Sequence, residues 1–95
     1  MTTPIKIGSV CKYNGPDWGM TGWTVKVTAL MRVHPVQPSE SATDEVETYT
    51  TQREVDAVGG FRKSDCAEVA AYDPRRGRYL AGGHEVDALD LEVLP

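Results

Sequence analysis

Two cysteines and two histidines are the residues with the clearest capacity for chemistry. Cys11, His34, Cys66 and His84 together match the inventory of a tetrahedral structural zinc site. Such ligands usually come in close pairs, whereas each of these four stands at least 18 residues from the next. The spacing therefore favours free thiols over a metal centre, and we expect no cofactor. A Cys11–Cys66 disulfide would need an oxidising environment and stays an open alternative.

No catalytic motif accompanies these residues. Neither cysteine has the surroundings typical of a Cys–His nucleophile pair, although such pairs meet only in space. The glycines of residues 15–22 do not open a helix, and no phosphate-binding loop sequence follows a strand. Most of the 14 acidic residues fall in 40–56 and 85–92, where a solvated surface accounts for them. The sequence therefore predicts a non-enzymatic protein, with a small hydrolase or metal protein as the weaker alternative.

Aromatic side chains near one loop suggest binding instead. Trp18 lies within the turn-rich segment 14–22, and Tyr13 and Trp23 flank that segment. Exposed aromatic rings bind peptides or unstacked bases. We expect Trp23 to be in the core, because it begins an alternating apolar series, and we take Tyr13 and Trp18 as candidates for partner binding.

A second candidate surface is the sequence Tyr-Asp-Pro-Arg-Arg-Gly-Arg-Tyr at 72–79. Its candidate partner-binding residues are Tyr72, Arg75, Arg76, Arg78 and Tyr79. Arginine presents a planar fork that matches carboxylate or phosphate, and it forms cation–π contacts with tyrosine. Two other interpretations stay open. The arginines can protect a sheet edge from aggregation, or they can lie against the acidic segment 40–47.

The net charge of −4 hides a strong segregation of charge along the chain. Residues 1–34 hold four cations against one acid, and residues 40–56 hold six acids against one arginine. Residues 61–78 are net basic again, and 85–92 hold four acids and no cation. An acidic total argues against indiscriminate nucleic-acid binding, but a local basic face remains open. The candidate residues for such a face are Lys6, Lys12, Lys26 and Arg32.

Length and composition predict one small domain. Ninety-five residues suffice for one core, and 40% hydrophobic with 25% charged residues is typical of a globular chain. No segment approaches the roughly 20 apolar residues that span a bilayer. The N-terminal residues lack the apolar stretch of a secretory signal, so we expect a cytoplasmic protein with no membrane contact.

The periodicity of the chain is that of β-strands. Apolar residues alternate from 23 to 33 and again at 5 and 7, with a change of phase at Gly8. We expect a long polar loop at 35–44, a strand from 46 that continues to Val58, and a hairpin over 66–88 that turns at 73–77. Gly82 and Gly83 are expected to kink the return strand of this hairpin before 84–88. A short helical turn capped by Asp87 and a closing strand complete the prediction, with no other helix.

The opening residues Gly-Ser-Val-Cys-Lys-Tyr, the glycine-rich loop and Trp-Thr-Val-Lys-Val resemble the start of SH3-like small barrels, especially the KOW variety. The ending Asp-Leu-Glu-Val-Leu-Pro is similar to the last strand of many such domains. The resemblance covers about 5–33 and 84–95. It implies a mainly β barrel of five or six antiparallel strands and, as one alternative function, binding of RNA or DNA.

The favoured prediction is a non-enzymatic module that binds a protein partner, as monomer or homodimer. The loop aromatics, the arginine turn and the acidic loop would make the contact, and segregated charge would orient the partners. A small inhibitor or regulator of phage type is one form that such a module could take.

Overall fold

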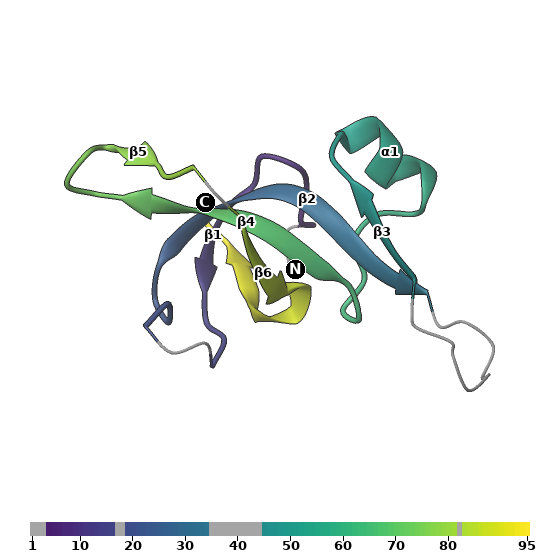
Figure 1. Ribbon diagram of the computed structural model, residues 1–95, viewed down its shortest axis with the longest axis horizontal. Helices are drawn as coiled ribbons and strands as arrows, with labels where there is room; N and C mark the ends of the chain where they lie inside the picture. Colours follow the sequence, from purple (N-terminus) through teal and green to yellow (C-terminus); the bar gives the residue numbers. More distant parts are fainter. Residues whose placement is uncertain (1–3, 17–18, 35–44, 82) are drawn as a thin grey trace.

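The computed structural model describes residues 4–16, 19–34, 45–81 and 83–95 and consists mainly of β-strands (Figure 1). The elements, in chain order, are β1 (Val10–Tyr13), β2 (Thr24–His34), β3 (Glu45–Tyr49), α1 (Gln52–Ala57), β4 (Cys66–Asp73), β5 (Arg78–Tyr79), β6 (His84–Asp87), the 3-10 turn η1 (Ala88–Asp90) and β7 (Leu91–Val93). The predicted mainly β class is confirmed, and the described residues form seven strands in place of the five or six expected. The expected polar loop at 35–44 and the side chain of Trp18 lie outside the described residues.

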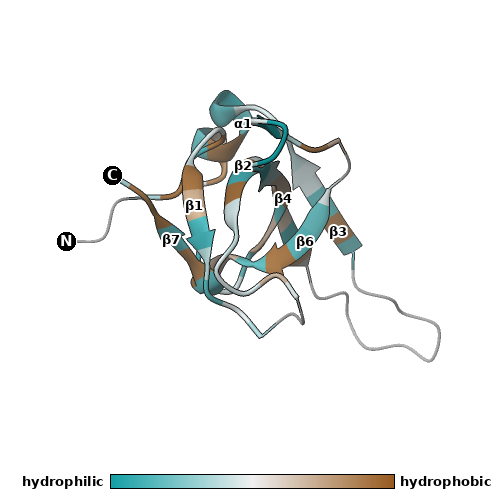
Figure 2. Ribbon diagram, turned by 90° about the vertical axis from the view of Figure 1, so that its left-hand side faces the viewer, coloured by the Kyte–Doolittle hydropathy of each residue, from teal (hydrophilic) through white to brown (hydrophobic). Residues whose placement is uncertain are grey.

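All strand pairs are antiparallel, and the strands form one open sheet. Its order is β5-β4-β2-β1-β7, while β3 pairs with β2 and β6 pairs with β4. Seen from the end in Figure 2, β7, β1, β2, β4 and β6 surround a common interior. Among the described residues no strand pairing joins β7 back to the other side of the sheet, so hydrogen bonds do not close it into a barrel.

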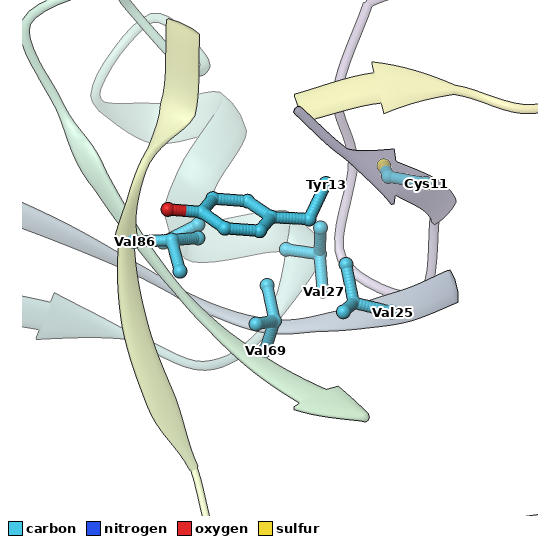
Figure 3. Packing of buried hydrophobic residues seen from close by; sticks show 7 residues of the cluster. Cys11, Tyr13, Val25, Val27, Val69 and Val86 are labelled. Atoms are coloured by element: carbon cyan, nitrogen blue, oxygen red, sulfur yellow. The ribbon is translucent and has the colours of Figure 1, made fainter. Parts of the chain in front are cut away.

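The core fills the interior face of this bent sheet. Its buried members are Cys11, Tyr13, Val25, Val27, Ala67, Val69 and Val86, drawn from four strands. The ring of Tyr13 lies across the valines, and its hydroxyl end points toward Val86 (Figure 3). A Cβ atom at Gly15 would collide with this ring, so glycine permits the close approach. Tyr13 is 1% exposed and is therefore a core residue.

A bulge in β2 explains where the alternating pattern fails. Val25 and Val27 face the core as predicted, but the register with β4 shifts between Val27 and Ala29. A bulge places an extra residue in one strand and reverses which side chains face inward. Beyond it Arg32 is buried and Val33 is 42% exposed, the opposite of the prediction for this end of the strand.

The expectation that Trp23 belongs to the core is also wrong. The residue precedes β2 and is 42% exposed. Its ring meets the ring of His84 edge-on, with centroids 6.5 Å apart. Trp23 is at the position two residues before Val25 in the core-facing alternation of β2. It lies just before the first residue of the strand, however, and is only partly covered.

The segment after β3 is a helix, not the predicted continuation of a strand. Thr51 caps α1, because its Oγ1 accepts a hydrogen bond from the Glu54 N–H at 3.2 Å, and Val55 is fully buried. Thr51-x-x-Glu54 is a capping-box sequence, a local signal for a helix start. The alternating residues Ile5 and Ile7 also lie outside any strand. Ile7 and Gly8 are in a turn, with Gly8 at φ 89°.

The last third of the chain agrees with the predicted hairpin. In the turn between β4 and β5, Gly77 takes the left-handed conformation at φ 65°, and its N–H donates to the Asp73 carbonyl at 2.8 Å. The short helical turn and the closing strand are present as η1 and β7. Asp87 precedes η1 but makes no side-chain capping bond. Its carboxylate accepts a hydrogen bond from the Cys66 thiol instead, with sulfur and oxygen 3.6 Å apart.

Candidate binding surface

The β4–β5 hairpin presents three arginines on an ordered turn. Asp73 organises the turn, since its Oδ1 accepts the Arg75 N–H at 2.9 Å and its Oδ2 lies 3.5 Å from the Arg76 Nε. Arg75, Arg76 and Arg78 are all exposed. Exposed guanidinium groups keep their donors available for an incoming carboxylate or phosphate.

Two tyrosines form the base of this turn. Tyr72 and Tyr79 are direct cross-strand partners, and their rings meet edge-on with centroids 5.2 Å apart. Lys26 of β2 adds a further cation, because its Nζ lies 5.4 Å from the centroid of the Tyr79 ring. The structure thus brings together residues from three strands. We name this set the arginine-turn surface: Lys26, Tyr72, Arg75, Arg76, Arg78 and Tyr79.

The arginine-turn surface lies at one end of the long axis of the molecule (Figure 1). The opposite end carries β3 and α1, whose acids are Glu45, Glu47, Glu54 and Asp56. The arginines therefore do not meet the described part of the segment 40–47, and their near acid is Asp73 of their own hairpin. The segregation of charge along the chain becomes a separation of charge in space.

The first aromatic candidate does not reach the surface. Tyr13 is a core residue and is not available to a partner, contrary to the prediction. Side chains of a strand alternate between its two faces, so Tyr13 lies on the same buried side of β1 as Cys11, two residues earlier. Trp18 is outside the described residues. Of the aromatic candidates that the structure describes, Tyr72 is exposed and Tyr79 is half-buried.

The four candidate nucleic-acid residues do not all lie on one face, because Arg32 is buried, whereas Lys12 and Lys26 lie on the outward side of the paired strands β1 and β2. Lys6 lies in the N-terminal turn, where its N–H donates to the Ser9 hydroxyl. Lys12 on β1 stands opposite Glu92 of β7 in the register. Lys26 belongs to the arginine-turn surface. Arg32 is only 7% exposed, so the assignment of this residue to a nucleic-acid face is wrong.

Arg32 is the centre of a buried ion pair with Asp65. Its Nε and Nη2 each donate to the carboxylate at 2.9 Å, and its remaining donors reach the carbonyls of Val58 at 3.0 Å and Gly60 at 2.8 Å. Asp65 also accepts the Arg62 N–H at 2.7 Å. One arginine therefore contacts both ends of the connection between α1 and β4.

This environment shifts both pKa values in favour of the charged pair. Burial by itself would raise the pKa of Asp65. Hydrogen bonds from Arg32 and from the Arg62 N–H, together with the charge of Arg32, outweigh burial and hold that pKa below its ordinary value. The hydrogen bond to Asp65 raises the pKa of Arg32 further. The pair is therefore ionised across the physiological range.

The cysteines are free thiols in separate places. Cys11 is buried in the core, and burial raises its pKa. Burial also raises the pKa of Cys66, and the neighbouring Asp87 carboxylate raises it further. Within the described ranges, no group of three or more histidine, cysteine and acidic side chains could hold a metal ion.

The structure also contains a groove that the sequence did not predict. It is an open hollow of about 600 Å³ lined by Ile5, Asn14, residues 61–63 and residues 88–93. Leu89 at its border is 64% exposed, more than any other large apolar residue of the described chain. Four separate segments line the groove, so no local pattern could reveal it.

Comparisons of the chain with protein-family models, with curated proteins and with solved structures found no match. Among the described residues, no helix is both long and apolar enough to cross a membrane.

Proposed function

We propose that this chain is a small SH3-like β-barrel domain that acts as a non-enzymatic interaction module. The arrangement of the strands supports the first part. The hairpin of β1 and β2 encloses a glycine-rich loop, and a 3-10 turn leads into a last strand that returns to pair with the first. The module binds an acidic segment of a protein partner through the arginine-turn surface.

The observation that carries this function is the presence of three exposed arginines on one hairpin turn, with a fourth cation, Lys26 of the neighbouring strand β2, at the ring of Tyr79. Arginine and tyrosine are enriched in the residues that dominate binding energy at protein interfaces. The surface is rigid at its base, because Asp73 and Gly77 hold the turn. A partner would therefore lose little of its binding energy to ordering this side of the contact.

A protein partner fits this surface better than unstacked bases do. The rings of Tyr72 and Tyr79 already contact each other, and Lys26 occupies a face of Tyr79, so these rings offer little free area for stacking. The acidic net charge also disfavours a polyanion. Binding of RNA or DNA in the KOW manner remains the second candidate, because Lys26 of β2 adds to the basic charge beside the hairpin.

Affinity capture from a nuclease-treated lysate tests the proposal. The variant carries Arg75→Ala, Arg76→Ala and Arg78→Ala. The control removes the same charge elsewhere, through Lys6→Ala, Lys12→Ala and Arg53→Ala, which are all exposed. We expect proteins bound by the wild type and the control to be lost from the arginine variant, since each interface arginine of this kind costs about 2 kcal/mol or more.

Two outcomes would reject this function. Retention of the bound proteins by the arginine variant would remove the arginine-turn surface from the interface. Binding of a single- or double-stranded oligonucleotide at near-physiological salt, with an affinity that falls steeply as salt is added, would favour the nucleic-acid alternative.

A further inference from the structure

The strand β7 exposes backbone hydrogen-bonding groups along the groove. It lies at the end of the sheet order, paired on one side with β1. The Leu94 N–H donates to the Val10 carbonyl and the Asn14 N–H to the Asp90 carbonyl, so the even-numbered residues point their backbone groups toward β1. Backbone groups of an antiparallel strand alternate in direction. The groups of Leu91 and Val93 therefore point away from β1.

Most of these outward groups lack a partner. The Leu91 N–H donates to the Ala88 carbonyl, which leaves the Leu91 carbonyl and both groups of Val93. None of them makes a hydrogen bond to any other described residue. An edge with free donors and acceptors is a template for another strand.

The groove beside this edge has an exposed leucine next to a hollow. Leu89 is 64% exposed at the rim, and the hollow of about 600 Å³ has apolar lining from Ile5, Phe61 and Leu91. Within one chain, the side chain of Leu89 is exposed and leaves the hollow open. A second copy could place its own Leu89 there.

The charges of the groove are self-complementary. Arg62 and Lys63 line one part, and Asp90 and Glu92 line another. A two-fold axis places a patch against the same patch of the partner, so an arrangement with the axis between the basic and the acidic part sets each basic part against the acidic part of the other copy. The backbone of Arg62 is held in place, because its N–H donates to the Asp65 carboxylate.

We propose that this groove is the interface of a two-fold homodimer. The β7 edges of two copies pair antiparallel, with Val93 opposite Val93 of the second copy, so that each Val93 N–H donates to the other Val93 carbonyl, and each Leu89 enters the opposite hollow. The interface shares no residue with the arginine-turn surface, so this proposal does not rest on the proposed function. Because β7 has only three residues, the contact is small and the dimer is weak.

Sedimentation equilibrium at low salt tests the dimer. We expect the mass to rise from the 10.4 kDa of one chain toward twice that value as the concentration approaches about 1 mM, the range of weak complexes. A wild type that stays monomeric throughout would overturn the proposal.

A charge exchange tests the geometry. One variant carries Arg62→Glu and Lys63→Glu, and the other carries Asp90→Lys and Glu92→Lys. We expect each to be monomeric alone, because like charges then face each other, and the equimolar mixture to form a heterodimer. Dimers of either variant alone, or a mixture that stays monomeric, would overturn the two-fold arrangement.

A second pair of variants covers the case in which these changes disturb folding. Leu89→Glu should weaken the dimer at least about 10-fold, since it puts a charge into an apolar contact. Val46→Glu is the matched control, because Val46 is also exposed, at 51%, but lies on β3. Circular dichroism confirms that both variants are folded. Equal effects of the two changes would overturn the assignment of Leu89 to the interface.

Discussion

Removal of the Asp65 carboxylate should destabilise this protein more than any loss of a surface charge. Asp65→Ala takes away two hydrogen bonds from Arg32 and one from the Arg62 N–H. The Arg32 side chain is 8% exposed, so its charge would stay buried with only two carbonyl oxygens as partners. A buried charge without its counter-ion is costly, because neither water nor a carboxylate solvates it.

The expected cost is about 3–5 kcal/mol in the free energy of unfolding. A chain of 95 residues has a total stability of about 5–14 kcal/mol, so one substitution removes a large share of it. In a domain of this size, 1 kcal/mol corresponds to about 4–8 °C, and the melting temperature should fall by at least about 12 °C.

Urea denaturation followed by circular dichroism measures this cost. Arg76→Ala is the control, since it breaks an ion pair whose Arg76 side chain is 63% exposed, and it should cost about 0–1 kcal/mol. The double change Arg32→Ala with Asp65→Ala should cost less than the sum of the single changes, because no unpaired charge remains. If Asp65→Ala costs no more than Arg76→Ala, the reasoning about burial is refuted.

The same pair predicts a dependence of stability on pH. Because the pKa of Asp65 is lower in the folded state than in the unfolded chain, its contribution is complete above the unfolded value of about 3.9. The contribution is lost as the pH falls through the folded pKa. Asp65→Asn lacks this titration, so the difference in stability between wild type and variant should narrow below about pH 4. A constant difference down to pH 2 would contradict the assigned shift.

Three further predictions concern local features. Thr51→Ala removes the cap of α1 and should cost about 1 kcal/mol in urea denaturation, and no loss would contradict the cap. Gly15→Ala forces a Cβ into the ring of Tyr13 and should cost about 1–3 kcal/mol, whereas unchanged stability would show that the ring can move. Iodoacetamide should modify the buried Cys11 at least about 10-fold more slowly than Cys66 in the native state and equally fast in urea, and equal native rates would place Cys11 at the surface.

Several features of the fold follow from short stretches of sequence. The turn at 73–77 was predictable, because proline and glycine restrict the backbone locally. The first half of β2 was predictable from its alternation, since each residue there faces the core or the solvent in turn. The start of α1 could also have been found, because Thr51 and Glu54 have the capping-box spacing, but the β-branched residues before it favoured a strand.

Other features depend on partners that are distant in the chain. The bulge in β2 reverses the burial of Arg32, and Arg32 is stable there only because Asp65 stands 33 residues away on the connection to β4. Lys26 joins the arginine-turn surface only because β2 and the β4–β5 hairpin lie side by side in the sheet. Local sequence thus limits the backbone to strands and turns. Which charge is buried and which ring is exposed depends on how the sheet bends, because burial is a property of the packed chain and not of any one segment.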